Sequence, residues 1–150
     1  ICFVRNPVKR FVSGYMNKID RVFSNFKDNI KPKIEILKIL GKDLSDVNQC
    51  IDLDEFIYAI DKVQNPENIN KHFAPQVFSL FPEIIQYDFI LKLEKIKFEL
   101  LNLEKSTGIR IDLSENKKKT KRPKIDLTKR HREFIYSYFD IDYKTFGYSK

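Results

Sequence analysis

Apolar residues at the start of the chain form a continuous run and then recur with helical spacing. Residues 1–4 are all apolar, which is typical of a strand covered on both faces. Asn6 and Pro7 follow, and these residue types suit the cap and the first turn of a helix. Beyond them, apolar residues three or four positions apart predict one buried helix face, formed by Val8, Phe11, Val12, Tyr15, Ile19 and Val22.

The same kind of pattern predicts three elements in the middle of the chain. Residues 51–60 indicate a helix of about two to three turns. Residues 87–93 alternate and are rich in aromatic and branched side chains, which predicts a strand. Residues 94–104 predict a helix that ends near Gly108. The inward face expected for this helix comprises Ile96, Leu100, Leu101 and Leu103.

The last part of the chain predicts one more helix and a docked end. Residues 127–138 have helical spacing, and residues 139–148 form an aromatic-rich end that we expect to pack on the core. The other segments lack a clear period and are expected to be mixed, looped, or, for residues 72–81, irregular or partly helical. These are residues 31–47, with an apolar stretch at 34–40 that stops at Gly41, residues 65–71, residues 72–81 and residues 112–124.

The order of the predicted elements is typical of an α/β fold. A strand, two helices, a strand and two helices along one chain indicate helices layered on a parallel sheet. The 150 residues are the length of one domain. Two strands are few for such a sheet, and the chain opens on Ile1 in mid-strand. We therefore expect residues 1–150 to be the helix-rich C-terminal portion of a longer, N-terminally truncated domain.

The composition shows that the chain is basic. Lys and Arg number 28 against 21 Asp and Glu, and the net charge of +7 favours nucleic acid, acidic glycans, phosphate-bearing cofactors or anionic membranes as partners. A lysine-rich surface that maintains solubility also accounts for much of this excess. No apolar run of about 18 residues is present, so no membrane-spanning helix is predicted. The two cysteines form no CxxC pattern, and Cys2 is expected to be buried.

One polar helix face near the start of the chain carries candidate binding chemistry. Arg5 leaves the carboxyl end of the first strand, where α/β sheets place their ligands. Arg10, Ser13 and Asn17 recur at helical spacing, opposite the apolar face. A helix start offers N–H donors to an anion, and an arginine fork matches phosphate oxygens, so this is a candidate phosphate clamp. Pattern alone favours the simpler interpretation, an amphipathic helix with a polar outer face.

Four segments in order resemble a known enzyme family. Residues 4–15 (VRNPVKRFVSGY) are similar to the motif Arg-Asp-Pro-x-x-Arg-x-x-Ser-x-Tyr, which binds the 3′-phosphate in sulfotransferases that use 3′-phosphoadenosine 5′-phosphosulfate (PAPS). Residues 72–76 (HFAPQ), 87–96 (YDFILKLEKI) and 139–149 (FDIDYKTFGYS) resemble segments of the Golgi-type carbohydrate sulfotransferases of the chondroitin and dermatan group and their bacterial relatives. The ordered set is more specific than the first motif alone.

The resemblance implies a P-loop-like α/β fold and transfer of a sulfuryl group from PAPS to a carbohydrate hydroxyl, without a metal. At the matching positions of the first motif, Arg5 and Ser13 would hold the 3′-phosphate of the donor, with Arg10 in support. In relatives, a basic loop before the last helix helps to hold the nucleotide phosphates. The candidates for that role here are Lys119, Lys121 and Arg122.

The chain departs from the family pattern at several places. Asn6 replaces an aspartate, which removes a charge but keeps a capping oxygen. Phe73 stands for Trp, Leu91 for Gly and Phe139 for Tyr. The family's lysine-containing loop, which cradles the 5′-phosphosulfate, has no counterpart in residues 1–150. We therefore expect the chain to carry roughly half of the donor site.

The reaction implied by the resemblance needs a general base to accept the proton of the sugar hydroxyl. His72 lies in a family-like segment and is the candidate; the alternative is a histidine that only holds its loop by hydrogen bonds. In some related sulfotransferases the base lies upstream of the first motif, which would place it outside this chain. His131, among basic residues, is expected on the surface, and Glu94 is expected to have a structural role at a strand end.

Three functions are compatible with these observations. The leading hypothesis is a PAPS-dependent carbohydrate sulfotransferase, of which this chain is a part whose activity can require the rest. The second is a non-catalytic relative that binds the nucleotide or a glycan. The third is a basic nucleic-acid-binding module based on residues 117–122, although no RNA or DNA motif accompanies that run. The resemblance implies a Golgi-lumenal protein in an animal and a cytoplasmic one in a bacterium.

Overall fold

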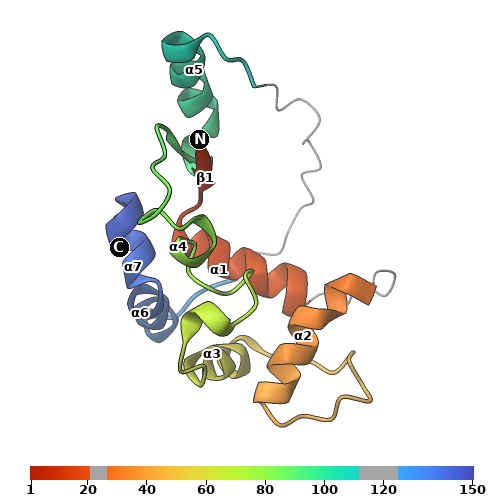
Figure 1. The fold of residues 1–150 in the computed structure, drawn as a ribbon. Helices are drawn as coiled ribbons and strands as arrows, with labels where there is room; N and C mark the ends of the chain where they lie inside the picture. Colours follow the sequence, from red (N-terminus) through yellow and green to blue (C-terminus); the bar gives the residue numbers. More distant parts are fainter. Residues whose placement is uncertain (21–26, 112–124) are drawn as a thin grey trace.

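The computed structural model of the chain describes residues 1–20, 27–111 and 125–150. Two short strands and a series of helices make up the described part (Figure 1). Short 3₁₀ turns at Pro66–Asn68 and Leu93–Lys95 and a π-helical turn at Met16–Asp20 complete the regular structure. The elements are β1 (Cys2–Val4), α1 (Pro7–Tyr15), α2 (Lys27–Ile39), α3 (Leu53–Asp61), α4 (Val77–Leu80), β2 (Ile90–Lys92), α5 (Ile96–Thr107), α6 (Lys129–Tyr138) and α7 (Asp140–Phe146).

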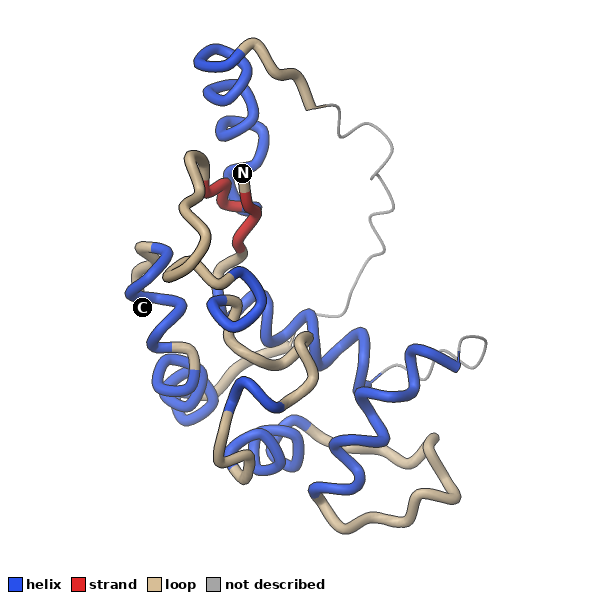
Figure 2. The backbone as a smooth tube through the Cα atoms, viewed as in Figure 1, coloured by secondary structure: helices blue, strands red, loops and turns tan. Residues whose placement is uncertain are grey.

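The helices form a body around α1, with α5 standing apart from it (Figure 1). Within that body α1 contacts α6, α3 contacts both α2 and α6, and α7 contacts α4 and α6. The two strands lie between the helical body and α5, as the tube view makes plain (Figure 2). The turn from β1 into α1 is therefore at the junction of the sheet and the helical body.

The strands β1 and β2 form a small parallel sheet. Cys2 pairs with Ile90 and Val4 with Lys92, and the N–H of Cys2 donates to the carbonyl of Phe89 at 2.9 Å. The expected parallel pairing is confirmed, and the second strand is shorter than the predicted residues 87–93. The described part of the chain is thus helix-rich with a two-stranded parallel sheet.

The start of α1 and the burial of Phe11 and Tyr15 are as the sequence predicts, and Val22 of the predicted face lies outside the described residues. The Asn6 side chain accepts a hydrogen bond from the N–H of Lys9 at 3.2 Å, and Pro7 occupies the first turn, where its missing N–H costs nothing. Phe11 is only 2% exposed and lies at the centre of the core. Its ring centroid is 5.2 Å from that of Phe56, 6.3 Å from Phe134 and 6.1 Å from Phe139, so one side chain ties α1 to α3 and α6.

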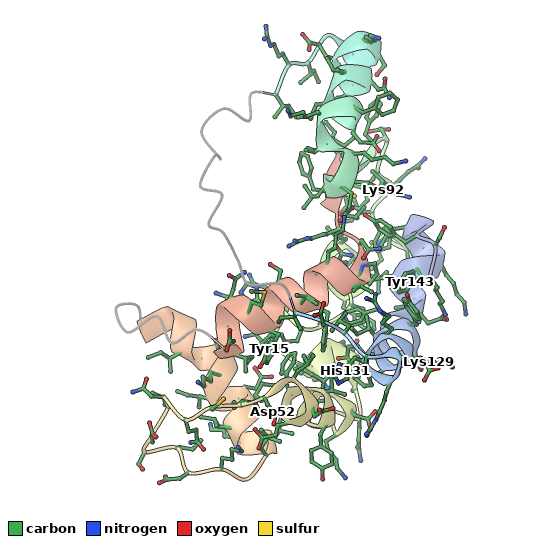
Figure 3. The ribbon with its side chains drawn as sticks, turned by 180° about the vertical axis from the view of Figure 1, so that it is seen from behind. Tyr15, Asp52, Lys92, Lys129, His131 and Tyr143 are labelled. Carbon is green, nitrogen blue, oxygen red and sulfur yellow. The ribbon has the colours of Figure 1, made fainter. Side chains whose placement is uncertain are left out.

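A hydrogen bond near the end of α1 and an apolar cluster at the sheet add to this packing. Tyr15, near the start of α3 where Asp52 forms the cap, donates its hydroxyl to the carbonyl of Ile51 at 3.0 Å (Figure 3). At the other end, a second apolar cluster covers the sheet, and Cys2 is buried in it as expected. The buried members of that cluster are Cys2, Val4, Val77 and Phe146.

Two helices were not predicted as such. α2 overlaps the first half of the segment expected to be mixed. It was missed because Pro32 in its interior and scattered polar residues weaken the helical pattern. α7 lies within the aromatic end at residues 139–148, and it ends at Gly147, whose φ of +59° is left-handed. The prediction that this end packs on the core is confirmed, since Tyr143 and Phe146 are buried.

Two residue placements predicted from the sequence are wrong. Leu101 was expected to face inward but is 56% exposed, because α5 packs against the rest of the molecule on one side only. His131 was expected on the surface but is 8% exposed. It lies in the first turn of α6, where its Nδ1 accepts from the N–H of Thr128 at 3.3 Å and its Nε2 contacts Asp54 Oδ1 at 3.1 Å. The capping box formed with Thr128 explains its burial.

Several large apolar residues in or near the strands, on α5 and in the loop before β2 are exposed, and together they are called the exposed apolar surface. They are Ile1, Phe3, Ile84, Ile85, Ile90, Leu93, Phe98 and Leu101. Parallel sheets are usually covered on both faces, so this surface is unusual for such a fold. Among the helices that the structure describes, none has the length and apolar character needed to cross a membrane.

Candidate nucleotide-binding site

A pocket of about 310 Å³ lies where β1 runs into α1. It brings together four of the predicted site residues, which come from the strand end, the polar face of α1 and the loop of residues 71–76. The lining residues that the structure describes include three cations and no carboxylate. They are Arg5, Arg10, Ser13, Gly14, Asn17, Lys18, His72, Gln76 and Leu93. Lys119, Lys121 and Arg122 lie outside the described residues, as does the basic run at 117–122.

The electrostatics of this pocket depend on cationic side chains more than on the helix start. The N–H of Asn6 donates to Glu94 Oε1 at 2.9 Å, and the N–H of Lys9 is used by the Asn6 cap. These backbone donors, which the sequence offered to an anion, are therefore already paired. Arg5 and Lys18 supply positive charge at the pocket wall instead.

Arg10 is anchored to the loop of residues 71–76. Its guanidinium donates to the carbonyl of Ala74 at 2.5 Å and to that of Lys71 at 2.6 Å. Burial lowers the pKa of Arg10 from its usual value, and the nearby carboxylate of Asp142 opposes that shift. An arginine remains charged in a protein under such conditions. Arg10 thus fixes the loop and places its charge at the pocket.

Gly14 allows the loop to approach α1 closely. A Cβ added at this position would be 3.0 Å from the carbonyl oxygen of His72 and 3.5 Å from the Phe73 ring. Arg10 holds the same loop by two hydrogen bonds, so the loop has little freedom to retreat. Beside the glycine, the Asn17 amide donates to Ser13 Oγ at 3.1 Å, which orients the serine on the pocket face of the helix.

His72 lies at the pocket in a positively charged environment. Burial lowers the pKa of its imidazole below the ordinary value of 6.5, and repulsion from Lys18, Lys71 and Arg10 lowers it further. The ring is therefore neutral at pH 7 and has a lone pair that can accept a proton. This protonation state suits the general base that the sequence proposed at this position.

We expect the His72 imidazole to titrate below 6.5 in the folded chain. The unfolded chain then binds the proton more readily, so this residue reduces stability as the pH falls below about 6.5. The measurement is an NMR titration of the two histidines, with the His72 signal assigned by its absence in His72→Gln. A pKa at or above 6.5 for that signal would contradict the expectation.

The four segments singled out in the sequence meet at this site through long-range hydrogen bonds. Glu94 accepts from the N–H of Asn6 at 2.9 Å and from the hydroxyl of Tyr148 at 3.1 Å. Burial and the Glu94 charge raise the pKa of Tyr148, which keeps that hydroxyl a donor. Lys92 donates to the carbonyl of Gly147 at 2.7 Å. Glu94 therefore has the structural position at a strand end that the sequence predicted.

Gln76 and Asp142 complete the network, and sequence reasoning did not select either as a site residue. The Gln76 side chain bonds to the backbone of Arg5, and the Asp142 carboxylate accepts from the N–H groups of Gln76 and Val77. Asp142 is fully buried. Their presence in the family-like segments 72–76 and 139–149 was the signal that could have pointed to them.

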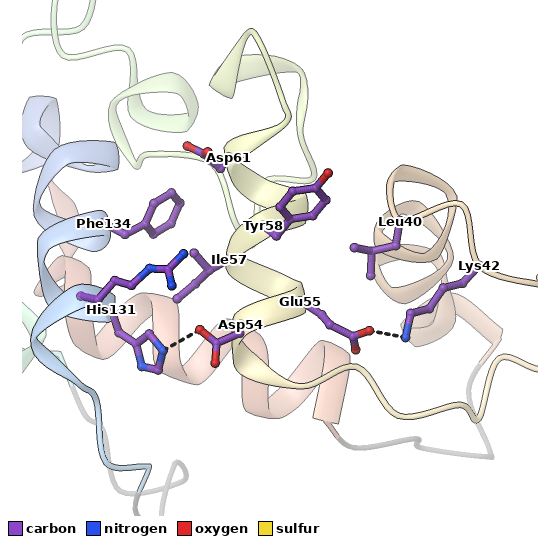
Figure 4. Close-up of a pocket in the computed structure, with 10 residues that line it drawn as sticks. Leu40, Lys42, Asp54, Glu55, Ile57, Tyr58, Asp61, His131 and Phe134 are labelled. Atoms are coloured by element: carbon purple, nitrogen blue, oxygen red, sulfur yellow. Dashed lines mark hydrogen bonds and ion pairs between the residues drawn. The ribbon is translucent and has the colours of Figure 1, made fainter.

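A larger groove of about 710 Å³ lies between α3 and α6 (Figure 4). Four of its polar side chains are already paired: His131 Nε2 contacts Asp54 Oδ1 at 3.1 Å, and Lys42 pairs with Glu55 at 2.5 Å. None of the four family-like segments contributes to its lining. The smaller, cationic pocket is therefore the better candidate. No group of three or more side chains suited to a metal ion occurs among residues 1–20, 27–111 and 125–150.

Comparison with known proteins is consistent with this pocket. Residues 1–149 match the sulfotransferase family. The chain belongs to that family. It is 27% identical over 96 residues to carbohydrate sulfotransferase 14 of Mus musculus and, equally, to that of Homo sapiens. Each alignment covers 63% of this chain and 25% of the relative. The matched region is thus about a quarter of the length of these curated relatives, and no solved structure matches the chain.

Membership of the sulfotransferase family implies a fold and a donor for the described elements. The family implies a P-loop-like α/β fold, in which β1 and β2 are parallel strands and the helices lie around them. It also implies PAPS as the sulfuryl donor. The turn between β1 and α1, where Arg5 and Ser13 line one pocket, has the cationic chemistry that a phosphate requires.

Proposed function

We propose that the chain forms the 3′-phosphate-binding part and the C-terminal portion of a PAPS-dependent carbohydrate sulfotransferase. The observation that supports this most is the cationic pocket that joins Arg5 and Ser13 to His72. Arg5 provides a planar fork for the phosphate oxygens, and Ser13 lies on the same pocket face of α1. The carbohydrate acceptor is inferred from the name of the relatives, carbohydrate sulfotransferase 14.

In the proposed reaction, His72 acts on the acceptor side of the pocket. A sugar hydroxyl oxygen forms a bond to sulfur while the bond from sulfur to the 5′-phosphate oxygen breaks. The phosphate oxygen keeps that electron pair, and the hydroxyl proton passes to the imidazole of His72. The lowered pKa of His72 keeps its imidazole neutral and able to take this proton. Arg5 and Ser13 would contribute mainly by holding the donor in line with the acceptor oxygen.

The exposed apolar surface supports a larger domain around this chain. β1 and β2 pair only with each other in the described part of the chain, and residues such as Phe3 and Phe98 are exposed beside them. We propose that further chain of the same domain covers this surface and supplies the loop for the 5′-phosphosulfate. Sulfuryl transfer would then require the whole domain, whereas 3′-phosphate recognition is a property of the residues present here.

The test is calorimetric titration of the chain with adenosine 3′,5′-bisphosphate and, separately, with 5′-AMP. We expect the bisphosphate to bind more tightly, because only it has a phosphate for Arg5 and Ser13. Arg5→Ala should weaken bisphosphate binding by about 10- to 150-fold, the equivalent of about 1.5–3 kcal/mol for a charge-assisted hydrogen bond, and leave 5′-AMP binding little changed.

The matched control is Arg132→Ala, which removes an exposed arginine of α6 that does not line the pocket. It lowers the net charge equally and should leave both affinities unchanged. Equal binding of the two nucleotides by the wild-type chain would contradict the proposal. Binding of nucleic acid with a steep salt dependence, and no preference for the 3′-phosphate, would favour the nucleic-acid module instead.

A further inference from the structure

The Gln76 side chain bonds to both backbone groups of Arg5, as the backbone of a neighbouring strand would. Gln76 Oε1 accepts from the N–H of Arg5 at 2.9 Å, and Gln76 Nε2 donates to the carbonyl of Arg5 at 2.8 Å. Along a strand, successive residues direct their backbone groups to opposite edges. Cys2 bonds to β2, so Arg5 faces the other edge. The Gln76 amide therefore pairs with the edge of the chain that faces away from β2, one residue beyond the end of β1.

The orientation of this amide is determined by Asp142. Asp142 Oδ2 accepts from the backbone N–H of Gln76 at 2.9 Å and from Nε2 at 3.3 Å, and Oδ1 accepts from the N–H of Val77 at 3.1 Å. An ionised carboxylate only accepts hydrogen bonds, so the NH₂ end of the Gln76 amide must face it. The carbonyl end then faces the N–H of Arg5. Gln76 is 7% exposed, and water competes little for these bonds.

The same residue connects the two sides of the pocket. Gln76 is the last residue of the loop that carries His72, and Arg10 holds the earlier part of that loop through the carbonyls of Lys71 and Ala74. Arg5 and His72 thus belong to one hydrogen-bonded unit. A change at Gln76 releases the backbone from which the Arg5 guanidinium extends, although Gln76 itself carries no charge to offer a phosphate.

We propose that Gln76 is a positioning residue, which fixes Arg5 for the 3′-phosphate and maintains its position relative to His72. This inference rests on the proposed function of the pocket. It differs from a purely structural role in one measurable respect. Loss of a positioning residue reduces the preference for the 3′-phosphate, whereas general loosening of the fold weakens the binding of every nucleotide.

Two substitutions separate these effects. Gln76→Glu keeps the shape but replaces the donor with a carboxylate oxygen, which cannot bond to the Arg5 carbonyl and repels Asp142. Gln76→Met keeps the length of the side chain but has no charge and no hydrogen-bonding amide. It is the variant to measure if the carboxylate of Gln76→Glu prevents folding. The matched control is Gln86→Glu, which makes the same charge change at an exposed glutamine that does not line the pocket.

The experiment measures dissociation constants for adenosine 3′,5′-bisphosphate and 5′-AMP by calorimetry, below the unfolding temperature of each variant. We expect both Gln76 variants to reduce the preference for the bisphosphate by about tenfold or more, the effect of misplacing one charge-assisted hydrogen bond. Binding of 5′-AMP should change by less than about threefold. Gln86→Glu should match the wild-type chain.

The outcomes distinguish this inference from the proposed function. A wild-type preference that persists in both Gln76 variants would overturn the positioning role and leave the proposed function intact. Equal weakening of both nucleotides would also overturn it, because that result indicates a structural role only. A wild-type chain without any preference would contradict the proposed function itself, and the inference with it.

Discussion

Replacing Phe11 by alanine is expected to lower the free energy of unfolding by about 3–5 kcal/mol, the largest stability loss that we predict for this chain. Phe11 is 2% exposed and contacts the rings of Phe56, Phe134 and Phe139. Its removal takes apolar area from the core and leaves a cavity that three other aromatic rings cannot fill without moving. Urea-induced unfolding, followed by circular dichroism, measures the change.

The control for this substitution is Phe98→Ala on α5. Phe98 is 62% exposed, so its removal should change the free energy of unfolding by about 0.5 kcal/mol or less. Similar losses for the two variants would show that α1 is not the centre of the core. Natural domains are stable by only about 5–15 kcal/mol, so the Phe11 variant should also unfold roughly 6–20 °C below the wild-type chain.

Asp142→Ala is expected to lower the free energy of unfolding by roughly 2–5 kcal/mol. The fully buried carboxylate accepts the N–H groups of Gln76 and Val77, and each buried donor left without a partner costs about 1–3 kcal/mol. Burial raises the pKa of Asp142, while these hydrogen bonds act in the opposite direction. Thermal and urea-induced unfolding both report the loss.

Asp140→Ala, on the same helix, is the control for Asp142→Ala. Asp140 forms surface ion pairs with Lys144 and Lys150, and such exposed pairs contribute little to stability. If removing Asp140 destabilised the chain as much as removing Asp142, general weakening of α7 would explain both results. The buried bonds to Gln76 and Val77 would then have no special importance.

Local signals in the sequence were sufficient to predict the part of the site that lies on α1. Asn6 and Pro7 predicted the start of α1, and the spacing of Arg10 and Ser13 placed both on the face opposite Phe11. These inferences succeed because they depend on helix geometry within a few residues. Recognition of the 3′-phosphate motif depended on resemblance, since the same spacing also fits an ordinary polar helix face.

The rest of the site and the burial of single residues depend on contacts between residues far apart in the sequence. Such contacts leave no periodic pattern in the sequence. Gln76 bonds to Arg5 across 71 positions, and Asp142 to Gln76 across 66. His131 contacts Asp54 across 77 positions, although Thr128, three residues earlier, was a local sign of a capped helix start. Leu101 was misplaced because the sequence does not say which neighbour covers α5.

The hydrogen bonds that hold the Arg5 turn have a consequence for the order of events during synthesis. That turn is secured by Gln76, which Asp142 orients, and by Glu94, which also binds Tyr148. A ribosome that adds about 5–20 residues per second takes roughly 7–27 s to advance from Arg5 to Asp142. Throughout that interval the emerging chain has made Arg5 but cannot yet hold it in place. The proposed nucleotide pocket is therefore among the last features of residues 1–150 to acquire its final geometry, because its first arginine is translated long before the residues that secure it.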